Sequence, residues 1–123
     1  MVPEMQDFTK LKVWQKAHSF TINLYRITAN FPVEERYGLT NQIRRASVSI
    51  ESNISEGCGR NGNREFCRFL DIAQGSANEV KCQVYIARDL GYIDGNTSQL
   101  LTDKINEVSK MISSFNQKLI TNN

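Results

Sequence analysis

Four polar side chains recur along one side of the segment 35–57, beside its apolar residues, and they are the first candidates for chemistry. They are Gln42, Ser49, Asn53 and Glu56, at intervals of seven, four and three. In a catalytic interpretation Glu56 is a general acid or base that Asn53 orients. No nucleophile, second carboxylate or histidine accompanies it at a defined spacing, although catalysis needs such a partner within reach. We therefore favour a structural polar network that hydrogen-bonds the helix ends and the adjacent turn, and we expect no enzymatic activity.

The histidine and cysteine residues give no metal-binding pattern. His18 is the only histidine, and no cysteine or carboxylate stands at a helical spacing from it that is typical of a ligand set. Cys58, Cys67 and Cys82 are odd in number and form no C-x-x-C pair, so neither a disulfide framework nor a zinc site is indicated. We expect reduced, structural thiols, no metal and no cofactor.

Arginine is concentrated between residues 36 and 68, where six arginines face only three acidic residues. The five that gather around the predicted second turn are Arg44, Arg45, Arg60, Arg64 and Arg68. Arginine suits bidentate contact with phosphate, and exposed amides at a helix N-terminus also suit an anion. A solvated, salt-bridged helix face explains the same residues, and the sequence leaves the two interpretations open.

Length and composition limit the classes of protein that fit these residues. The chain has 123 residues, enough for one domain with its own hydrophobic core, and 15 basic against 13 acidic residues. So small an excess gives no global field that would argue for nucleic-acid or membrane binding. There is no basic segment followed by an apolar run, and no stretch of about 20 apolar residues that could span a bilayer. We expect a cytoplasmic protein.

Apolar residues at alternating steps of four and three predict four helices, at about 8–30, 35–57, 63–90 and 96–120. The predicted core positions, in chain order, are Val13, Ala17, Phe20, Leu24, Ile27 and Phe31; Leu39, Ile43, Ala46, Ile50 and Asn53; Phe66, Leu70, Ala73, Ala77, Val80, Val84 and Ala87; and Leu101, Ile105, Val108, Ile112, Phe115 and Leu119. No alternating pattern of useful length predicts a strand. The expected fold is an all-α, antiparallel up-down-up-down four-helix bundle forming one domain over 1–123.

Helix-breaking residues mark the connections between these helices. Pro32 ends the first helix, and a break near Gly38 is compatible with the second. The segment 57–63 is expected to form the second turn because it contains three glycines and two asparagines. Gly91 stands where a left-handed C-terminal cap is wanted, and Asn96 with Gln99 is suited to cap the last helix.

A second apolar stripe predicts self-association. On the first helix it comprises Leu11, Trp14, His18, Thr21 and Tyr25, about a quarter-turn from the core stripe. On the third helix Phe69, Ile72, Ile86 and Leu90 add further apolar area. We place Trp14 and Tyr25 in an oligomer interface, since aromatic patches favour interfaces; a wider core is the alternative. Small residues around Gly75 in the third helix suggest close approach by another helix.

Several segments together resemble the four-helix-bundle proteins encoded within 23S rRNA intervening sequences of bacteria. The matching segments are Phe8-x-x-Leu-x-Val-Trp-x-x-Ala17, Phe31-Pro-x-x-Glu-x-Tyr-Gly-Leu39, Gln42-Ile-Arg-Arg-Ala46, Glu56-Gly57-x-Gly-Arg60, Glu65-Phe-x-Arg-Phe-Leu70 and Leu90-Gly-Tyr-Ile93. Three positions depart from the family pattern: Glu51 replaces a frequent proline, Ser55 an alanine, and Cys58 an aromatic residue. Without the proline, the second helix should be straighter.

The resemblance implies a bacterial, cytoplasmic bundle with a poorly defined biochemical role. The fold is also similar to that of the accessory variability determinant proteins of diversity-generating retroelements, which implies by analogy a cyclic homo-oligomer, most simply a pentamer, that engages nucleic acid. The leading hypothesis is a non-enzymatic, homo-oligomeric RNA-binding protein with a repeated arginine patch. The alternative is an adaptor for a protein encoded nearby, with no nucleic-acid binding. A hydrolase that uses Glu56 is the third and least favoured hypothesis.

Overall fold

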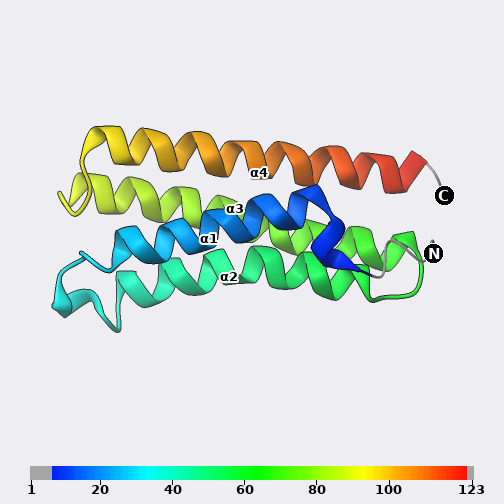
Figure 1. Ribbon diagram of the computed structural model, residues 1–123, viewed down its shortest axis with the longest axis horizontal. Coiled ribbons are helices and arrows are strands. Elements are labelled where there is room, and N and C mark those ends of the chain that lie inside the picture. The colour runs from blue at the N-terminus through cyan, green and yellow to red at the C-terminus, as the bar shows by residue number, and fades with distance from the viewer. Residues whose placement is uncertain (1–6, 122–123) are drawn as a thin grey trace.

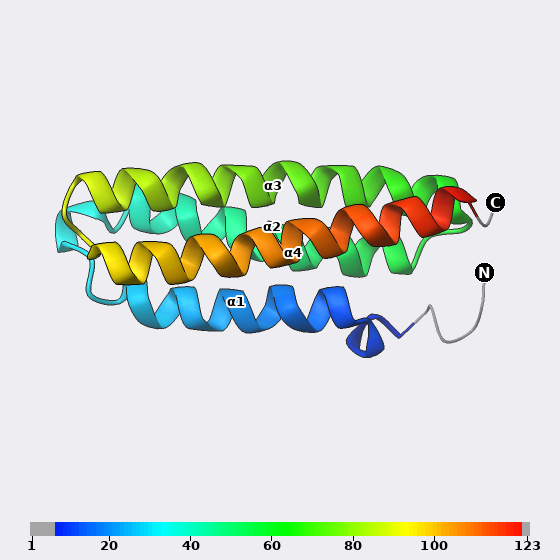
Figure 2. The same ribbon diagram turned by 90° about the horizontal axis from the view of Figure 1, so that it is seen from above.

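Four long helices form an antiparallel up-down bundle in the computed structural model, which describes residues 7–121 (Figure 1). The helices are α1 (Lys12–Thr28), α2 (Leu39–Cys58), α3 (Asn63–Asp89) and α4 (Gly95–Thr121). The most extensive contacts join α2 to α3 and α3 to α4, whereas α1 packs less extensively on α2 and α4 (Figure 2). The α2–α3 turn lies at one end of the bundle, and the α1–α2 and α3–α4 connections lie at the other.

The four apolar stripes meet in one main core, and Phe31, Leu39 and Ala87 form a smaller cluster of their own. Every predicted core position of the third helix is buried, and Leu24, Ile54, Leu70, Val80 and Val84 have no exposed surface. The prediction for α2 is wrong at its C-terminal end, because Asn53 is only half-buried and Ile54 takes the core position. From Ile50 the buried face advances by four residues to Ile54 and again to Cys58, which turns Asn53 toward the edge of the interface with α3.

The first helix begins later than its apolar pattern indicates. Phe8–Lys10 forms a separate 3-10 turn, capped by the Asp7 carboxylate, which accepts a hydrogen bond from the Thr9 amide at 3.1 Å. Leu11 is extended, so α1 starts at Lys12. The helix ends at Thr28, whose hydroxyl donates to the Leu24 carbonyl at 2.8 Å.

The second helix starts at Leu39 rather than near Glu35 because the Glu35 side chain is used as its cap. Its carboxylate accepts a hydrogen bond from the Leu39 amide at 2.9 Å, while Val33–Glu35 forms a short 3-10 turn. A Cβ at Gly38 would stand 2.7 Å from Glu35 Oε1, so glycine leaves room for this cap.

The α2–α3 turn is shorter than the glycines suggest, since α2 continues through Gly57 to Cys58. A Cβ at Gly57 would stand 2.8 Å from the Phe66 ring and 2.9 Å from Phe69 Cβ. Glycine therefore serves close helix packing here rather than a turn. Gly62 has a φ of 87° and precedes α3 directly.

Of the two caps predicted for the α3–α4 connection, the one at Gly91 is confirmed and the one at Asn96 is wrong. Gly91 has a φ of 79°, and the Tyr92 amide donates to the Ala87 carbonyl at 2.9 Å, as in a left-handed helix cap. Asp94, not Asn96, caps α4: its carboxylate accepts from the Thr97 amide at 2.7 Å, so the helix begins at Gly95.

Candidate nucleic-acid interface

Three arginines surround the α2–α3 turn, and we call Arg60, Arg64 and Arg68 the arginine turn. The guanidinium groups of Arg60 and Arg68 lie 5.1 and 5.0 Å from the centre of the Phe69 ring. Phe69 itself is 8% exposed, so the two arginines cover a ring that packs inward. A guanidinium held over a ring face is attracted by the ring while its N–H groups can still contact an anion.

Two of the three arginines also pair with glutamates. Arg60 Nη2 lies 3.1 Å from Glu56 Oε2, and Arg68 Nε lies 3.5 Å from Glu65 Oε2. All four side chains are roughly half-exposed, so solvent screens both pairs. Arg64 is exposed, and between residues 7 and 121 no carboxylate lies within ion-pair distance of it.

The structure separates Arg44 from the arginine turn. Its Nε donates to Thr28 Oγ1 at 2.8 Å, its Nη2 donates to the Tyr25 carbonyl at 3.0 Å, and the guanidinium lies 4.4 Å from the Tyr25 ring centre. Arg44 therefore closes the C-terminal end of α1. A cation at that position also complements the helix dipole.

Arg45 lies apart from both. It is exposed and lines a shallow groove between α2 and α3 with Gln42, Ser49, Ser76 and Glu79. From Arg45 to the end of α2 is a distance of ~20 Å along the helix axis. The five arginines thus occupy three places on one subunit.

The four residues of the predicted polar network, like the five arginines, do not form a single cluster. The Asn53 amide donates to the Ser49 carbonyl at 2.8 Å and to Ser49 Oγ at 3.0 Å, and Ser49 Oγ lies 2.9 Å from Ser76 Oγ on α3. The structure brings Ser49 and Asn53 together in a bridge between α2 and α3. Gln42 lies on the groove, and Glu56 pairs with Arg60 at the turn.

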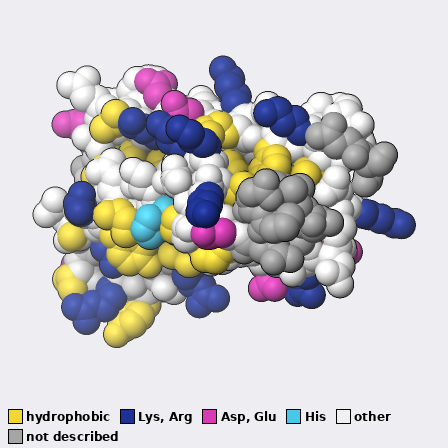
Figure 3. Space-filling model, turned by 45° about the vertical axis from the view of Figure 1, so that its right-hand side comes forward, with side chains coloured by type: hydrophobic (Ala, Val, Ile, Leu, Met, Phe, Trp, Pro, Cys, Tyr) yellow, Lys and Arg dark blue, Asp and Glu magenta, His cyan; other side chains and the backbone are white. Residues whose placement is uncertain are grey.

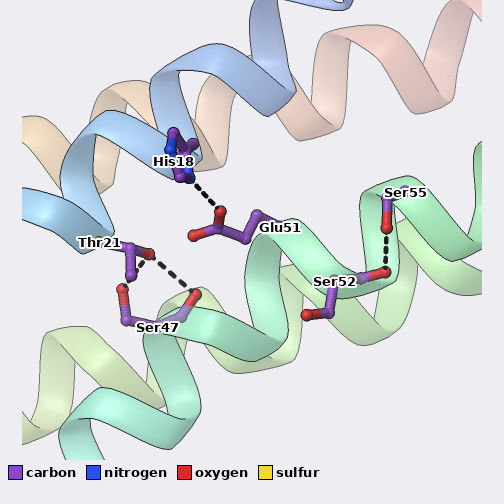
Figure 4. Close-up of polar contacts among 6 residues, drawn as sticks. All are labelled: His18, Thr21, Ser47, Glu51, Ser52 and Ser55. Atoms are coloured by element: carbon purple, nitrogen blue, oxygen red, sulfur yellow. Dashed lines mark hydrogen bonds and ion pairs between the residues drawn. The ribbon is translucent and has the colours of Figure 1, made fainter. Parts of the chain in front are cut away.

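A polar contact that the sequence analysis missed joins α1 to α2 (Figure 4). His18 Nδ1 lies 2.6 Å from Glu51 Oε2, and the imidazole stacks on Trp14 with ring centres 4.7 Å apart. The Glu51 side chain is 12% exposed, and its Oε1 has no hydrogen-bond partner among the described residues. Nearby, Thr21 Oγ1 lies 2.7 Å from Ser47 Oγ. The only sequence signal was glutamate at a position where the resembled family often has proline.

A second missed contact joins two of the motifs on which the resemblance rests. The Tyr92 hydroxyl donates to Glu35 Oε2 at 2.8 Å, and the Phe31 and Tyr92 rings lie 5.5 Å apart. Hydrogen bonds from the Leu39 amide and then from Tyr92 lower the pKa of Glu35. The hydrogen bond to Glu35 raises the pKa of the Tyr92 hydroxyl. The two motifs therefore form the packed end of the bundle opposite the arginine turn.

Glutamine and serine side chains fix the pairing of α3 with α4. Gln74 donates to the Ser109 carbonyl at 3.1 Å and to Ser113 Oγ at 2.8 Å, and it accepts a hydrogen bond from Ser109 Oγ. One helical turn further toward the arginine turn, Asn116 donates to Asp71 at 2.8 Å. These bonds select one register for the two helices.

The described residues contain no group of three or more metal-binding side chains. The three cysteines are free, and burial raises the pKa values of the Cys58 and Cys67 thiols. Within 7–121 no helix is both long and apolar enough to cross a membrane.

The chain is similar in sequence and in fold to proteins of one known family. The family model described as 23S rRNA-intervening sequence protein matches residues 9–114. A crystal structure of a protein of unknown function from the S23 ribosomal protein family of Bacteroides thetaiotaomicron is 25% identical, with a TM-score of 0.75 over 85% of this chain and 97% of that one. No curated protein matches the chain. The match over most of the sequence, together with the shared bundle, shows that the chain belongs to the 23S rRNA-intervening sequence protein family.

Proposed function

We propose that this protein binds the phosphate backbone of RNA through the arginine turn, and that it does so as a homo-oligomer that repeats this turn. The proposal concerns binding rather than catalysis. The observation that carries it is the pair of guanidinium groups held against Phe69 at 5.1 and 5.0 Å. Because Phe69 already orients these guanidinium groups, they lose little conformational freedom when they donate hydrogen bonds to a phosphate.

The N-terminus of α3 adds a second attraction for anions at the same place. Gly62 precedes the helix and makes no side-chain cap, so the first-turn amides receive no hydrogen bond from the capping residue's side chain. The positive end of the helix dipole favours a phosphate there. The family name associates these chains with an intervening sequence of 23S rRNA, which makes RNA the polyanion to test first.

A single copy offers a modest charge. Three arginines less Glu56 and Glu65 leave a net charge of +1 at the turn. The glutamate pairs are exposed and each contributes roughly 0–1 kcal/mol, so exchanging them for phosphate contacts costs little. Useful affinity then requires several turns acting together, because linked sites raise the effective concentration of one another.

Exposed apolar residues on two different faces support the homo-oligomer. Tyr25 and Val48 are 39% and 37% exposed on the α1–α2 face, and Ile72 and Ile86 are 42% and 43% exposed on α3. Two unlike patches favour a head-to-tail contact, which closes into a ring when the rotation allows it. A ring of five is what the retroelement resemblance implies. Trp14 is partly buried against Phe8 and His18 in its own chain, so its place in the interface stays a prediction.

The ion pairs of Arg60 with Glu56 and of Arg68 with Glu65 favour one alternative function, because they are what a solvated, salt-bridged surface would show. If these arginines are only a solvated surface, the oligomer is an adaptor for a protein partner and binds no nucleic acid.

The test is to titrate a fluorescent RNA duplex with the wild-type protein and with single alanine variants. Arg64→Ala should weaken binding, because Arg64 is the arginine of the turn that has no carboxylate partner among residues 7–121. Arg36→Ala is the matched control, since Arg36 is an exposed arginine of the α1–α2 connection, which lies at the opposite end of the bundle. Equal losses in the two variants would remove the arginine turn as the site, and no duplex binding by the wild type would leave the adaptor function.

A further inference from the structure

A groove between α1 and α4 carries a second concentration of positive charge that is distinct from the arginine turn. It has a volume of about 570 Å³ and follows the α1–α4 seam, where packing is less extensive than between α3 and its neighbours. Three cations line it, Lys16, Arg26 and Lys104, against one carboxylate, Glu107, so its net charge is +2 without His18. Lys16 and Glu107 pair across the seam at 3.5 Å, and both are half-exposed.

The cations are spread along the groove. Lys16 and Arg26 are separated by ~15 Å along α1, the rise of ten helical residues. Arg26 and Lys104 are exposed, and neither has a carboxylate within ion-pair distance in the part of the chain that the structure describes. This spacing suits a chain of phosphates rather than a single small anion.

A fixed aromatic surface stands in the same groove. Trp14 covers one face of the His18 imidazole at 4.7 Å with an interplanar angle of 10°, and the hydrogen bond to Glu51 fixes the edge of the ring. His18 nevertheless remains 46% exposed in its side chain. Figure 3 shows hydrophobic side chains gathered beside the histidine and Lys and Arg side chains around them. An exposed ring face of this kind can stack an unpaired base.

We propose that this groove binds a single-stranded segment of nucleic acid, with phosphates on Arg26, Lys104 and Lys16 and a base on the open face of His18. The inference extends the proposed RNA binding, since the arginine turn contacts phosphates without regard to strandedness whereas the groove selects unpaired nucleotides. It requires a ring contact that uses Tyr25 and Val48 and leaves Trp14 and His18 uncovered, so it is incompatible with Trp14 in the interface. Ser19 and Asn23 also line the groove and offer hydrogen bonds to sugar or base. A duplex keeps its bases stacked on one another and cannot use His18.

The chain contains its own reporter, because Trp14 is the only tryptophan and lines this groove. An oligoadenylate of about eight nucleotides should change Trp14 emission saturably, and an abasic strand of equal length should bind at least about fivefold more weakly because it forfeits stacking. Equal affinity of the two strands would overturn the stacking role.

Single variants inside and outside the groove test whether its cations and the His18 ring bind the strand. Arg26→Ala and Lys104→Ala should each lower the salt slope for oligoadenylate by about 0.7. Lys110→Ala, an exposed lysine of α4 outside the groove, should leave it unchanged. His18→Ala should weaken binding about tenfold, whereas His18→Phe keeps a ring and should restore most of the loss. A loss in Lys110→Ala equal to that in Lys104→Ala would overturn the groove as the site.

One further comparison distinguishes this inference from the proposed function. The variant with Arg60, Arg64 and Arg68 all changed to Ala should lose duplex binding but keep the Trp14 response to oligoadenylate. If duplex binding is absent in the wild type while that response persists, the arginine turn fails and the groove stands. If only a glutamate-rich helical peptide changes Trp14 emission, the groove is a protein-docking site and the inference is wrong.

Discussion

Individual side chains at the end of the bundle opposite the arginine turn do two tasks at once. Glu35 caps α2 through the Leu39 amide and accepts the Tyr92 hydroxyl at 2.8 Å, so one carboxylate ties the α1–α2 connection to the α3–α4 connection. Local spacing in the sequence cannot predict this bond, because its partners lie 57 positions apart. The same is true of His18 and Glu51, which are 33 positions apart and meet only when α1 packs on α2.

The Glu35–Tyr92 bond predicts a two-sided pH dependence of stability. The folded pKa of Glu35 lies below its ordinary 4.5, so its contribution is full above that pH and is lost as pH falls through the lowered value. The folded pKa of Tyr92 lies above its ordinary 10.0, so the contribution is present below that pH and is lost as pH rises through the raised value. Urea unfolding midpoints of wild type and Tyr92→Phe should therefore differ most near neutral pH and converge at both extremes. A constant difference across the range would contradict this account.

At the scale of helices, the apolar pattern predicted most of the fold because periodicity alone decides which face of a helix is buried. Every core position predicted for α3 is buried. The pattern was wrong for Phe69, which it placed in the second stripe and which is buried, and it did not predict the buried polar residue Gln83. It failed where a helix cap or the close packing of two helices decided the outcome. Glu35 caps α2 and so moves its start to Leu39, and Asp94 rather than Asn96 caps α4. Gly57 lies inside α2, where glycine allows close packing, although glycine more often ends a helix.

For the candidate site, the pattern identified the arginines, and the helical rise along α2 already separates Arg45 from the turn by ~20 Å. It could not predict the bonds of Arg44 to Thr28 and Tyr25, because these form only when α1 packs on α2.

Two helical glycines should respond to alanine with opposite signs. Gly57→Ala places a Cβ within 3 Å of Phe66 and Phe69 and should destabilise the protein by about 1–3 kcal/mol through overpacking. Gly75→Ala places a Cβ that meets no atom of the described residues within 4 Å, and it should stabilise the helix by up to about 1 kcal/mol. Chemical denaturation of both variants measures the two effects. Stabilisation by Gly57→Ala would show that α2 and α3 do not approach so closely.

At the scale of the whole molecule, the two exposed apolar patches predict assembly by unlike faces. Val48→Glu disables the α1–α2 patch and Ile72→Glu disables the α3 patch, and both residues are exposed enough for the fold to survive. In a head-to-tail ring each variant alone should be a monomer by light scattering at micromolar concentration. An equimolar mixture should form a dimer, because the intact patch of one variant meets the intact patch of the other. A monomeric wild type would end the proposal of a ring, and a mixture that stays monomeric would show that these are not the two contacting faces.

The central claim is that a repeated arginine turn binds RNA phosphates, and its most direct test is the salt dependence of duplex RNA binding by the wild type and by the variant with Arg60, Arg64 and Arg68 changed to Ala. Phosphate contacts release condensed counterions, so the logarithm of the wild-type affinity should fall steeply and linearly with the logarithm of salt concentration. The triple variant should have a slope smaller by roughly two to three units for each subunit that engages the RNA, whereas Arg36→Ala should have the wild-type slope. Equal slopes in the wild type and the triple variant, or no binding by the wild type even at ~50 mM salt, would contradict the claim.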